Sequence, residues 1–286
     1  MKALQVHAFD APIQMTNVDI PEPSQGQIRL KIAACGLNFA DLLMQKGTYQ
    51  DTPELPFTLG MEVAGIVDAT GPDTDASAVG SRVAVFGGQG GLAEFGCFDV
   101  DRMITLPDSM PFLDAAALQI AYGTSHVALD YRAGLQAGET LLVLGAAGGV
   151  GLTAVELGKL MGARVIAVAR GADKCAIATQ AGADHVIDAT DADLRADLKA
   201  LGGVDAVYDP VGGDQFKAAF RACNPEARIL TIGFASGDVP QIPANHLLVK
   251  NITVLGFYWG GYLAFKPQVV RDSLAQLVNW HSEGAL

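Results

Sequence analysis

The chain has 286 residues, of which 50% are hydrophobic and 17% charged, and its net charge is −12. This composition supplies enough apolar surface for the cores of two domains and excludes a disordered chain. The acidic balance disfavours nucleic acid as a partner, because phosphate binding requires an extended basic face.

The N-terminus and the cysteines indicate the compartment. The first ten residues alternate like a strand and lack the apolar core of a signal peptide, and no apolar stretch is long enough to span a membrane. The four cysteines lie far apart and form no C-x-x-C pair, which suits a reducing compartment. We therefore expect a soluble, cytoplasmic α/β protein.

Residues 1–115 have the pattern of a β-rich domain. Short apolar runs alternate with clusters of Pro, Gly and Asp, such as Pro21-Glu22-Pro23. This spacing is typical of short strands in a curled sheet or partial barrel. The runs are Ile28–Ala33, Val63–Ala69 and Arg82–Phe86.

Residues 116–258 have a different pattern, in which helical stretches alternate with compact β-branched runs. Nearly continuous apolar strands separated by helices predict a doubly wound parallel sheet that is covered on both faces. The runs are Thr140–Leu144, Arg164–Ala169, His185–Asp188, Ala206–Asp209, Arg228–Ile232 and Ile252–Phe257.

The turn after the first of these runs carries a dinucleotide-binding pattern. It reads Gly145-Ala146-Ala147-Gly148-Gly149-Val150-Gly151 and is followed by an expected helix over Leu152–Gly162. In such a unit Gly148 lets the backbone approach a pyrophosphate, and Gly151 lets the helix pack on the strand. An ordinary tight turn is the alternative explanation. The predicted phosphate-binding residues are Ala147, Gly148, Gly149, Val150 and Gly151.

The end of the second run indicates which dinucleotide binds. NAD sites place Asp or Glu there to bind the ribose hydroxyls. Here Ala169 is followed by Arg170, with Lys174 one turn later, so the acid is absent and two cations favour the 2′-phosphate of NADPH. The alternative is that both cations are solvated surface charges. Asp173 is expected to open the next helix.

Further residues stand where the fourth and fifth runs end. Dinucleotides bind across the carboxyl edge of such a sheet. We therefore expect Val211, Gly233 and Phe234 to contact the cofactor rings.

Several motifs in order along the chain carry a family resemblance. They are Cys35-Gly36-Leu37-Asn38-Phe39-Ala40-Asp41, Gly60-Met61-Glu62-Val63-Ala64-Gly65, Ala121-Tyr122-Gly123-Thr124, the glycine-rich turn, Asp209-Pro210-Val211-Gly212-Gly213 and Gly256-Phe257-Tyr258-Trp259-Gly260. The chain resembles the medium-chain dehydrogenases/reductases, in their zinc-free quinone oxidoreductase (zeta-crystallin-like) branch. The resemblance implies a GroES-like partial barrel over 1–115, a Rossmann domain over 116–258, and a segment 259–286 that returns to the first domain.

Two positions depart from the zinc-dependent members of that family. Asn38 stands where a zinc-binding Cys would be, and Met61 where a His would be, and neither side chain suits Zn²⁺. Without a metal, hydride transfer suits acceptors whose conjugation already stabilises the developing oxyanion. NADPH:quinone reductase activity is therefore the leading expectation. The alternatives are reduction of an enal, enone or enoyl thioester, and a non-catalytic NADPH-binding protein.

The resemblance also assigns residues near the nicotinamide. Asn38 and Thr124 would lie beside it, with Asn38 donating to the acceptor carbonyl; helix capping at Phe39 is a second role for Asn38. Tyr49 is a candidate phenol of the cleft or a packed loop aromatic. Leu43 stands where some relatives carry a tyrosine.

The last part of the sequence has an edge run and a helix. The run Ile252–Trp259 is an apolar edge strand, which should be covered. By resemblance it pairs with its twin in a homodimer; a cover from the C-terminal segment is the alternative. Residues Pro267–Ser282 predict an amphipathic helix. Relatives continue beyond it by a few dozen residues, so a shortened substrate domain is expected.

Overall fold

The computed structural model describes residues 1–190 and 192–286, which form two compact units. The first unit comprises Met1–Ile120 and Leu274–Ala285, and the second comprises Ala121–Ser273 with Leu286. The boundary between the units falls within helix α2 (Phe112–His126) and again within helix α9 (Pro267–Ser282). No helix in the described ranges is long and apolar enough to span a membrane.

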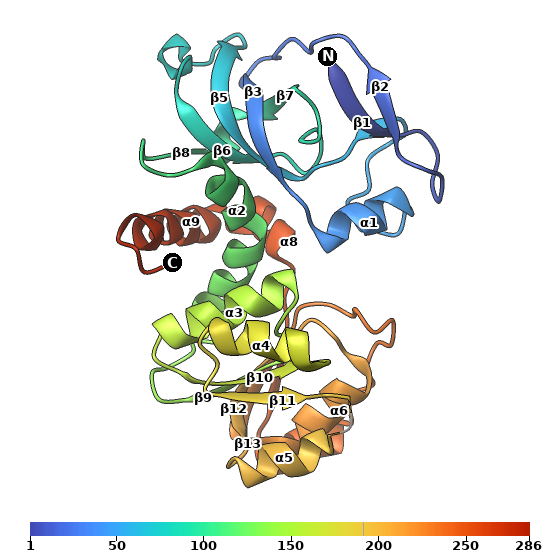
Figure 1. Cartoon of the computed structure of the whole chain (residues 1–286), viewed down its shortest axis with the longest axis vertical. Helices are drawn as coiled ribbons and strands as arrows, with labels where there is room; N and C mark the ends of the chain where they lie inside the picture. The colour runs from blue at the N-terminus through green and yellow to red at the C-terminus, as the bar shows by residue number, and fades with distance from the viewer. Residues whose placement is uncertain (191) are drawn as a thin grey trace. The chain divides into compact units, whose positions relative to one another are not determined.

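The first unit is built on two antiparallel sheets, of order β2-β1-β4 and β7-β3-β5-β6-β8 (Figure 1). Its β-rich pattern is confirmed. Its strands are β1 (Lys2–Val6), β2 (Gln14–Asn17), β3 (Gln27–Gly36), β4 (Phe57–Thr58), β5 (Glu62–Thr70), β6 (Arg82–Phe86), β7 (Phe95–Asp99) and β8 (Met103–Thr105). Its short helices are α1 (Phe39–Gln45), η1 (Ala76–Ala78) and η2 (Val100–Arg102).

Buried apolar residues alternate with more exposed residues along β3 and its neighbours, and the buried ones form the core of the first unit. Ile28 and Leu30 are fully buried, whereas Arg29 between them faces the other side and pairs with Asp68, at 3.0 Å from Nε to Oδ1. A period of two is what a strand with one buried face requires. The buried cluster consists of Ile28, Leu30, Val63, Val67, Val83, Val85 and Phe98.

The second unit is a six-stranded parallel sheet of order β11-β10-β9-β12-β13-β14 (Figure 1). The predicted doubly wound fold is confirmed, with the strand order of a Rossmann sheet. The strands are β9 (Thr140–Val143), β10 (Arg164–Ala169), β11 (His185–Asp188), β12 (Val204–Asp209), β13 (Cys223–Thr231) and β14 (Thr253–Gly256). The helices are α3 (Gly149–Leu160), α4 (Ala172–Gln180), α5 (Leu194–Ala200), α6 (Gly213–Ala222), α7 (Ala244–Lys250), α8 (Trp259–Phe265) and the π-helical η3 (Val127–Arg132).

Both faces of this sheet are buried. Leu142 and Leu144 join the apolar cluster that includes residues of α5 and α6. On the opposite face, a Cβ atom on Gly158 of α3 would lie 2.6 Å from Leu141, so this helix packs closely on the strand. Burial on both faces explains why the strands read as continuous apolar runs.

Several predicted elements have different limits in the structure; the predicted run Arg228–Ile232, for example, begins at Cys223 as β13. Helix α3 begins at Gly149, three residues before the predicted start, because the last glycines of the turn already form its first turn. The edge strand ends at Gly256, not at Trp259, which opens α8. The shortening has a physical reason: Gly256 pairs with Thr231, the last residue of β13, so no partner strand continues beyond it.

Candidate functional site

In the second unit, β9 passes into α3 through the glycine-rich turn. Gly145 has a left-handed φ of +59°, and Gly148 is the N-cap of α3. A Cβ atom on Gly151 would lie 2.2 Å from the carbonyl oxygen of Gly145. Glycine at position 151 therefore permits the helix to start against the turn. The first N–H groups of this 12-residue helix are directed out of its N-terminus, where they suit a phosphate group.

The turn lies at the point where the strand order reverses, between β9 and β12. Val211, two residues beyond β12, lies against it: a Cβ atom on Gly145 would be 2.9 Å from Val211 Cγ2. Ligands of doubly wound sheets bind at such a point. The structure thus brings the predicted Val211 next to the predicted glycine-rich turn.

A buried carboxyl group shapes the loop after β12. Asp209 is 1% exposed, and its Oδ1 accepts the N–H groups of Val211 (2.8 Å) and Gly212 (2.9 Å). Burial raises the pKa of Asp209, while these two hydrogen bonds oppose the rise. The Gly233 N–H donates to the Asp209 carbonyl at 3.3 Å, which ties the end of β13 to the same loop. Phe234 follows with its ring about half exposed.

The end of β10 bears the two predicted cations. Ala169 is buried, whereas Arg170 and Lys174 are exposed and form no hydrogen bond or ion pair with any residue in the described ranges. Asp173 lies in the first turn of α4, as expected. Both cations are therefore available to an anion.

An acid that the sequence reasoning did not weigh lies one strand away. Asp188 ends β11 and stands opposite Ala169 in the parallel register. Its Oδ1 accepts the Gly171 N–H at 2.9 Å and the Thr190 hydroxyl at 2.7 Å, and the Gly171 bond is the main reason that its pKa is lowered. Aligning the second and third predicted strands in parallel register would have placed Asp188 opposite Ala169.

A buried hydroxyl network supports the start of α3. Ser125, next to the predicted Thr124 on α2, donates to the Val150 carbonyl at 2.9 Å. Its Oγ also lies 2.8 Å from Thr153 Oγ1 and 2.9 Å from the Tyr208 hydroxyl. The network joins α2, α3 and β12, and Thr124 itself is 7% exposed.

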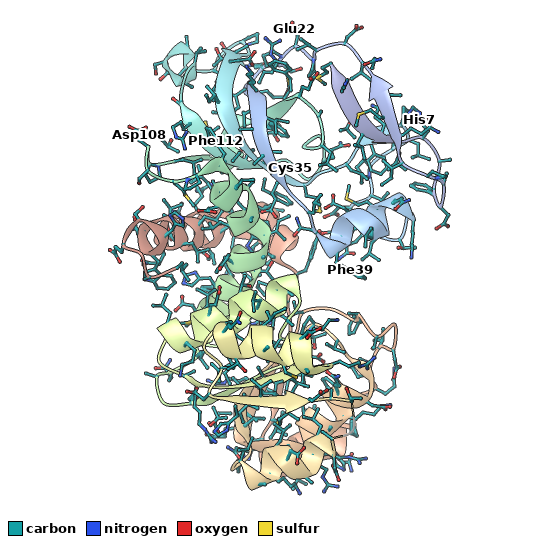
Figure 2. The ribbon with its side chains drawn as sticks, viewed as in Figure 1. His7, Glu22, Cys35, Phe39, Asp108 and Phe112 are labelled. Carbon is teal, nitrogen blue, oxygen red and sulfur yellow. The ribbon has the colours of Figure 1, made fainter. Side chains whose placement is uncertain are left out.

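In the first unit, Asn38 is the N-cap of α1, so its predicted capping position is confirmed. Its backbone N–H donates to Asp41 Oδ2 at 2.8 Å, and its side-chain Nδ2 donates to Glu62 Oε1 at 2.9 Å. Figure 2 labels Cys35 near the end of β3 and Phe39 at the start of α1, on either side of Asn38. The contact of Asn38 with a nicotinamide stays a prediction.

Glu62 is the site residue that sequence reasoning missed. It is 2% exposed, and its Oε2 accepts the Ile120 N–H at 2.8 Å. Burial raises the pKa of Glu62 to about 7. Asp41, 6% exposed, also has a raised pKa because of burial, and its Oδ1 accepts the Gly60 N–H at 3.1 Å. The sequence could have indicated this residue, because a glutamate at the start of an apolar strand is unusual unless it is paired.

The other predicted positions of the first unit are also defined. Tyr49 lies half-buried in the turn after α1, where its carbonyl accepts the Thr52 hydroxyl at 2.7 Å. Met61 is buried. Within the described residues, no group of three or more His, Cys, Asp or Glu side chains is arranged to hold a metal ion.

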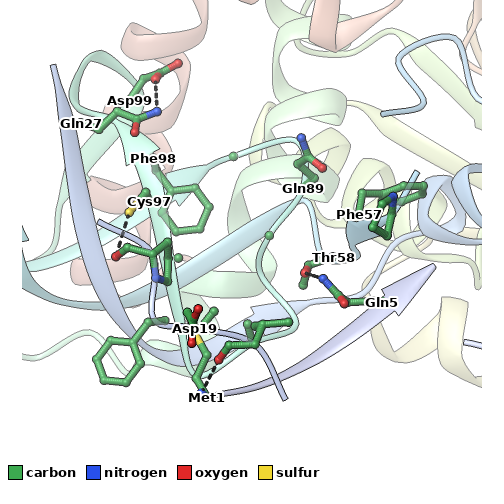
Figure 3. A pocket seen from close by; sticks show the side chains of 18 of the residues that line it. Met1, Gln5, Asp19, Gln27, Phe57, Thr58, Gln89, Cys97, Phe98 and Asp99 are labelled. Atoms are coloured by element: carbon green, nitrogen blue, oxygen red, sulfur yellow. Dashed lines mark hydrogen bonds between the residues drawn. The ribbon is translucent and has the colours of Figure 1, made fainter. Parts of the chain in front are cut away.

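A cavity of about 490 Å³ also lies in the first unit (Figure 3). Polar groups of its wall pair with one another: Gln5 with Thr58 at 3.3 Å and Gln27 with Asp99 at 3.2 Å. None of the predicted site residues is among the described residues that line it.

Comparison with known proteins shows the family. A family model for "Zinc-binding dehydrogenase" matches residues 149–279, and one for "Alcohol dehydrogenase GroES-like domain" matches residues 24–108. A quinone oxidoreductase-like protein 2 homolog of Nematostella vectensis is 40% identical over 265 residues, which cover 91% of this chain and 72% of the relative. The chain belongs to the medium-chain dehydrogenase/reductase superfamily, in its quinone oxidoreductase branch.

Two solved structures of that branch are similar over nearly all of this chain. The quinone oxidoreductase of Thermus thermophilus, solved also in complex with NADPH, has a TM-score of 0.86 and 32% identity, covering 98% of this chain and 87% of that one. The Escherichia coli quinone oxidoreductase in complex with NADPH has a TM-score of 0.92 and 27% identity, covering 100% and 89%. Membership of this branch makes the protein an oxidoreductase.

Proposed function

We propose that this oxidoreductase is an NADPH-dependent, zinc-independent reductase that transfers a hydride to a quinone. The observation that carries the proposal is the end of β10, where Ala169 replaces the usual acid and where Arg170 and Lys174 are exposed and unpaired within the described chain. Two free cations beside a dinucleotide-binding turn suit a 2′-phosphate. The Thermus thermophilus and Escherichia coli relatives were both solved in complex with NADPH, which supports the same cofactor here.

The residues of the second unit fit the parts of this cofactor. The glycine-rich turn offers free N–H groups to the pyrophosphate, and any side chain at Gly151 would push the helix away from it. When bound, NADPH supplies the hydride. The proposed cofactor-binding residues are Asn38, Thr124, Ala147, Gly148, Gly149, Val150, Gly151, Arg170, Lys174, Val211, Gly233 and Phe234.

The first unit supports a quinone as the acceptor. Asn38 holds its amide against Glu62 and Met61 is buried, so neither position offers a metal-ligating group. A conjugated acceptor does not need a Lewis acid, because conjugation stabilises the oxyanion that hydride addition creates. Asn38 is the proposed donor to the acceptor carbonyl, and Tyr49 is the second candidate.

The cofactor assignment is tested by measuring NADPH and NADH affinities for the wild type and Arg170→Ala. NADPH binding should weaken by about 1–3 kcal/mol, the scale of a lost charge-assisted contact, while NADH binding barely changes. Arg221→Ala is the matched control, because Arg221 is an exposed arginine in the last turn of α6. It lies just before the start of β13, at the amino end of the parallel strands, whereas dinucleotides bind at the carboxyl end. Equal losses for both cofactors would refute the 2′-phosphate contact.

The acceptor is tested with a panel of quinones beside a crotonyl thioester, with NADPH as donor. Quinones should be reduced with the higher kcat/KM. A preference of about a hundredfold for the thioester, roughly 3 kcal/mol in transition-state stabilisation, would assign the chain to enoyl reduction instead. Tight NADPH binding without turnover of any acceptor would indicate a non-catalytic binding protein.

We also propose a homodimer formed through the edge of the second unit's sheet. Strand β14 pairs only with β13 among the described strands, so its other edge is open. Leu248 and Val249 on α7, just before this strand, are 78% and 75% exposed. An open edge beside exposed apolar residues favours pairing with a second copy. The four unpaired cysteines support a reducing compartment such as the cytoplasm.

A further inference from the structure

The buried carboxylate of Glu62 makes hydrogen bonds with both of its oxygens. Oε1 accepts from Asn38 Nδ2 at 2.9 Å, and Oε2 accepts from the Ile120 N–H at 2.8 Å. An ionised carboxylate accepts hydrogen bonds and donates none. The ionised Glu62 therefore requires the amide nitrogen of Asn38, and not its oxygen, to face it.

The backbone of Asn38 is fixed as firmly as its side chain. Its φ of −126° and ψ of 155° are those of an N-cap, and its N–H donates to the buried Asp41 carboxylate at 2.8 Å. Asp41 in turn accepts the Gly60 N–H. The remaining freedom of Asn38 is the rotation of its amide, which exchanges the oxygen with the nitrogen. Glu62, whose Oε1 accepts from the amide nitrogen, favours one of the two orientations.

We propose that Glu62 is a positioning residue of the reductase: its buried carboxylate holds the Asn38 amide nitrogen inward and thereby sets the donor and acceptor groups that Asn38 presents to the substrate. The Asn38 nitrogen donates one N–H to Glu62, and its second N–H stays available for a substrate carbonyl. The Asn38 amide oxygen forms no hydrogen bond with the ionised Glu62. The inference rests on the proposed function in one respect, namely that Asn38 donates a hydrogen bond to the carbonyl of the acceptor.

The carboxylate of Glu62 packs closely against the backbone of β3 and α2. A Cβ atom on Gly36 would lie 2.5 Å from Glu62 Oε1 and 2.5 Å from the carbonyl oxygen of Ala116. Glycine at position 36 therefore admits the carboxylate between β3 and α2. Such packing keeps the Glu62–Asn38 contact in one geometry.

Protonation of Glu62 should release the Asn38 amide. Burial raises the pKa of Glu62 to about 7, the hydrogen bonds from Asn38 and Ile120 oppose the rise, and Asp41 on α1 adds to it. The Cys35 thiol on β3, with a pKa raised to about 12 mainly by burial, stays neutral. On α2, Gln119 and Ile120 do not titrate. A protonated Glu62 gains a donor, which the Asn38 oxygen can accept, so turnover should rise with pH through about 7.

The test compares the wild type with Glu62→Gln, with NADPH and para-benzoquinone as substrates. The introduced amide donates as well as accepts, so when its oxygen accepts the Ile120 N–H its nitrogen turns the Asn38 amide around. We expect kcat to fall roughly tenfold, the rise near pH 7 to disappear, and NADPH affinity to stay unchanged. Glu94→Gln is the matched control, since Glu94 is an exposed glutamate of the same unit that accepts one backbone N–H, and it should keep the wild-type profile.

A second measurement does not depend on turnover. The side-chain amide nitrogen of Asn38, followed by NMR in the wild type, should titrate with a midpoint near pH 7, and this titration should vanish in Glu62→Gln. No titration in the wild type overturns the proposal, as does a Glu62→Gln enzyme with an unchanged pH profile. A wild type that binds NADPH but reduces no quinone contradicts the proposed function, and the amide titration then decides the Glu62 contact alone.

Discussion

A methyl group on Gly151 would lie 2.2 Å from the carbonyl oxygen of Gly145, far closer than two such atoms can approach. Gly151→Ala should therefore push the start of α3 away from the turn and lower the free energy of unfolding by about 1–3 kcal/mol, the cost of overpacking. Denaturant unfolding measures the free energy of unfolding, and NADPH titration measures the effect of the displaced helix start on cofactor binding. Gly149→Ala is the control for stability alone, because nothing lies within 4 Å of its Cβ position, whereas Gly149 is itself a proposed cofactor-binding residue. Equal stability of the two variants would contradict the contact.

The charge on Glu62 should make stability depend on pH. The folded state holds the Glu62 proton up to about pH 7, whereas the unfolded chain loses it near the ordinary pKa of 4.5. Its contribution to stability is therefore present below the unfolded pKa and lost as the pH rises through about 7, by at most about 3 kcal/mol.

Urea unfolding over a series of pH values, in the wild type and Glu62→Gln, checks this sign. The variant should gain stability relative to the wild type as the pH rises from about 5 to about 8. A constant difference would show that the buried carboxyl does not titrate in this range. If the gain appears, the ionised form that positions Asn38 is the less stable one.

The Ser125–Tyr208 contact gives a prediction about buried hydroxyl groups. Tyr208 is fully buried, and Tyr208→Phe removes one hydrogen bond, at a cost of about 0.5–1.5 kcal/mol. Ser125→Ala should cost more, about 1–3 kcal/mol, because it leaves the Tyr208 O–H buried without that acceptor. The double variant should cost less than the sum of the two. Additive effects in unfolding experiments would mean that the two hydroxyls do not interact.

The proposed dimer interface can be tested by charge. Leu248→Glu should convert the dimer to a monomer with little effect on the stability of each chain, because Leu248 is 78% exposed within it. Light scattering after size exclusion measures the mass. Leu113→Glu, at an equally exposed leucine of the first unit (76%), should leave the dimer intact. A monomeric wild type would exclude the interface.

Much of the fold could be predicted because its signals are local. The run Arg164–Ala169 became β10 and Pro267–Ser282 became α9, since a period of two or of 3.6 along the chain reports directly which residues are buried. The limits of α3 were wrong by a few residues at its start. A glycine that ends a turn and one that begins a helix look the same in sequence, and packing on Gly145 distinguishes them.

Residues that lie close together along the chain were enough to predict the family, the parallel sheet, the glycine-rich turn and the capping position of Asn38. Contacts between distant segments were needed to show that Glu62, 24 residues from Asn38, accepts its amide nitrogen, and that Val211 lies against Gly145. The physical reason is that burial and hydrogen bonding depend on which strands and helices become neighbours. A carboxyl group acquires a raised pKa and a defined partner only when that packing removes it from water.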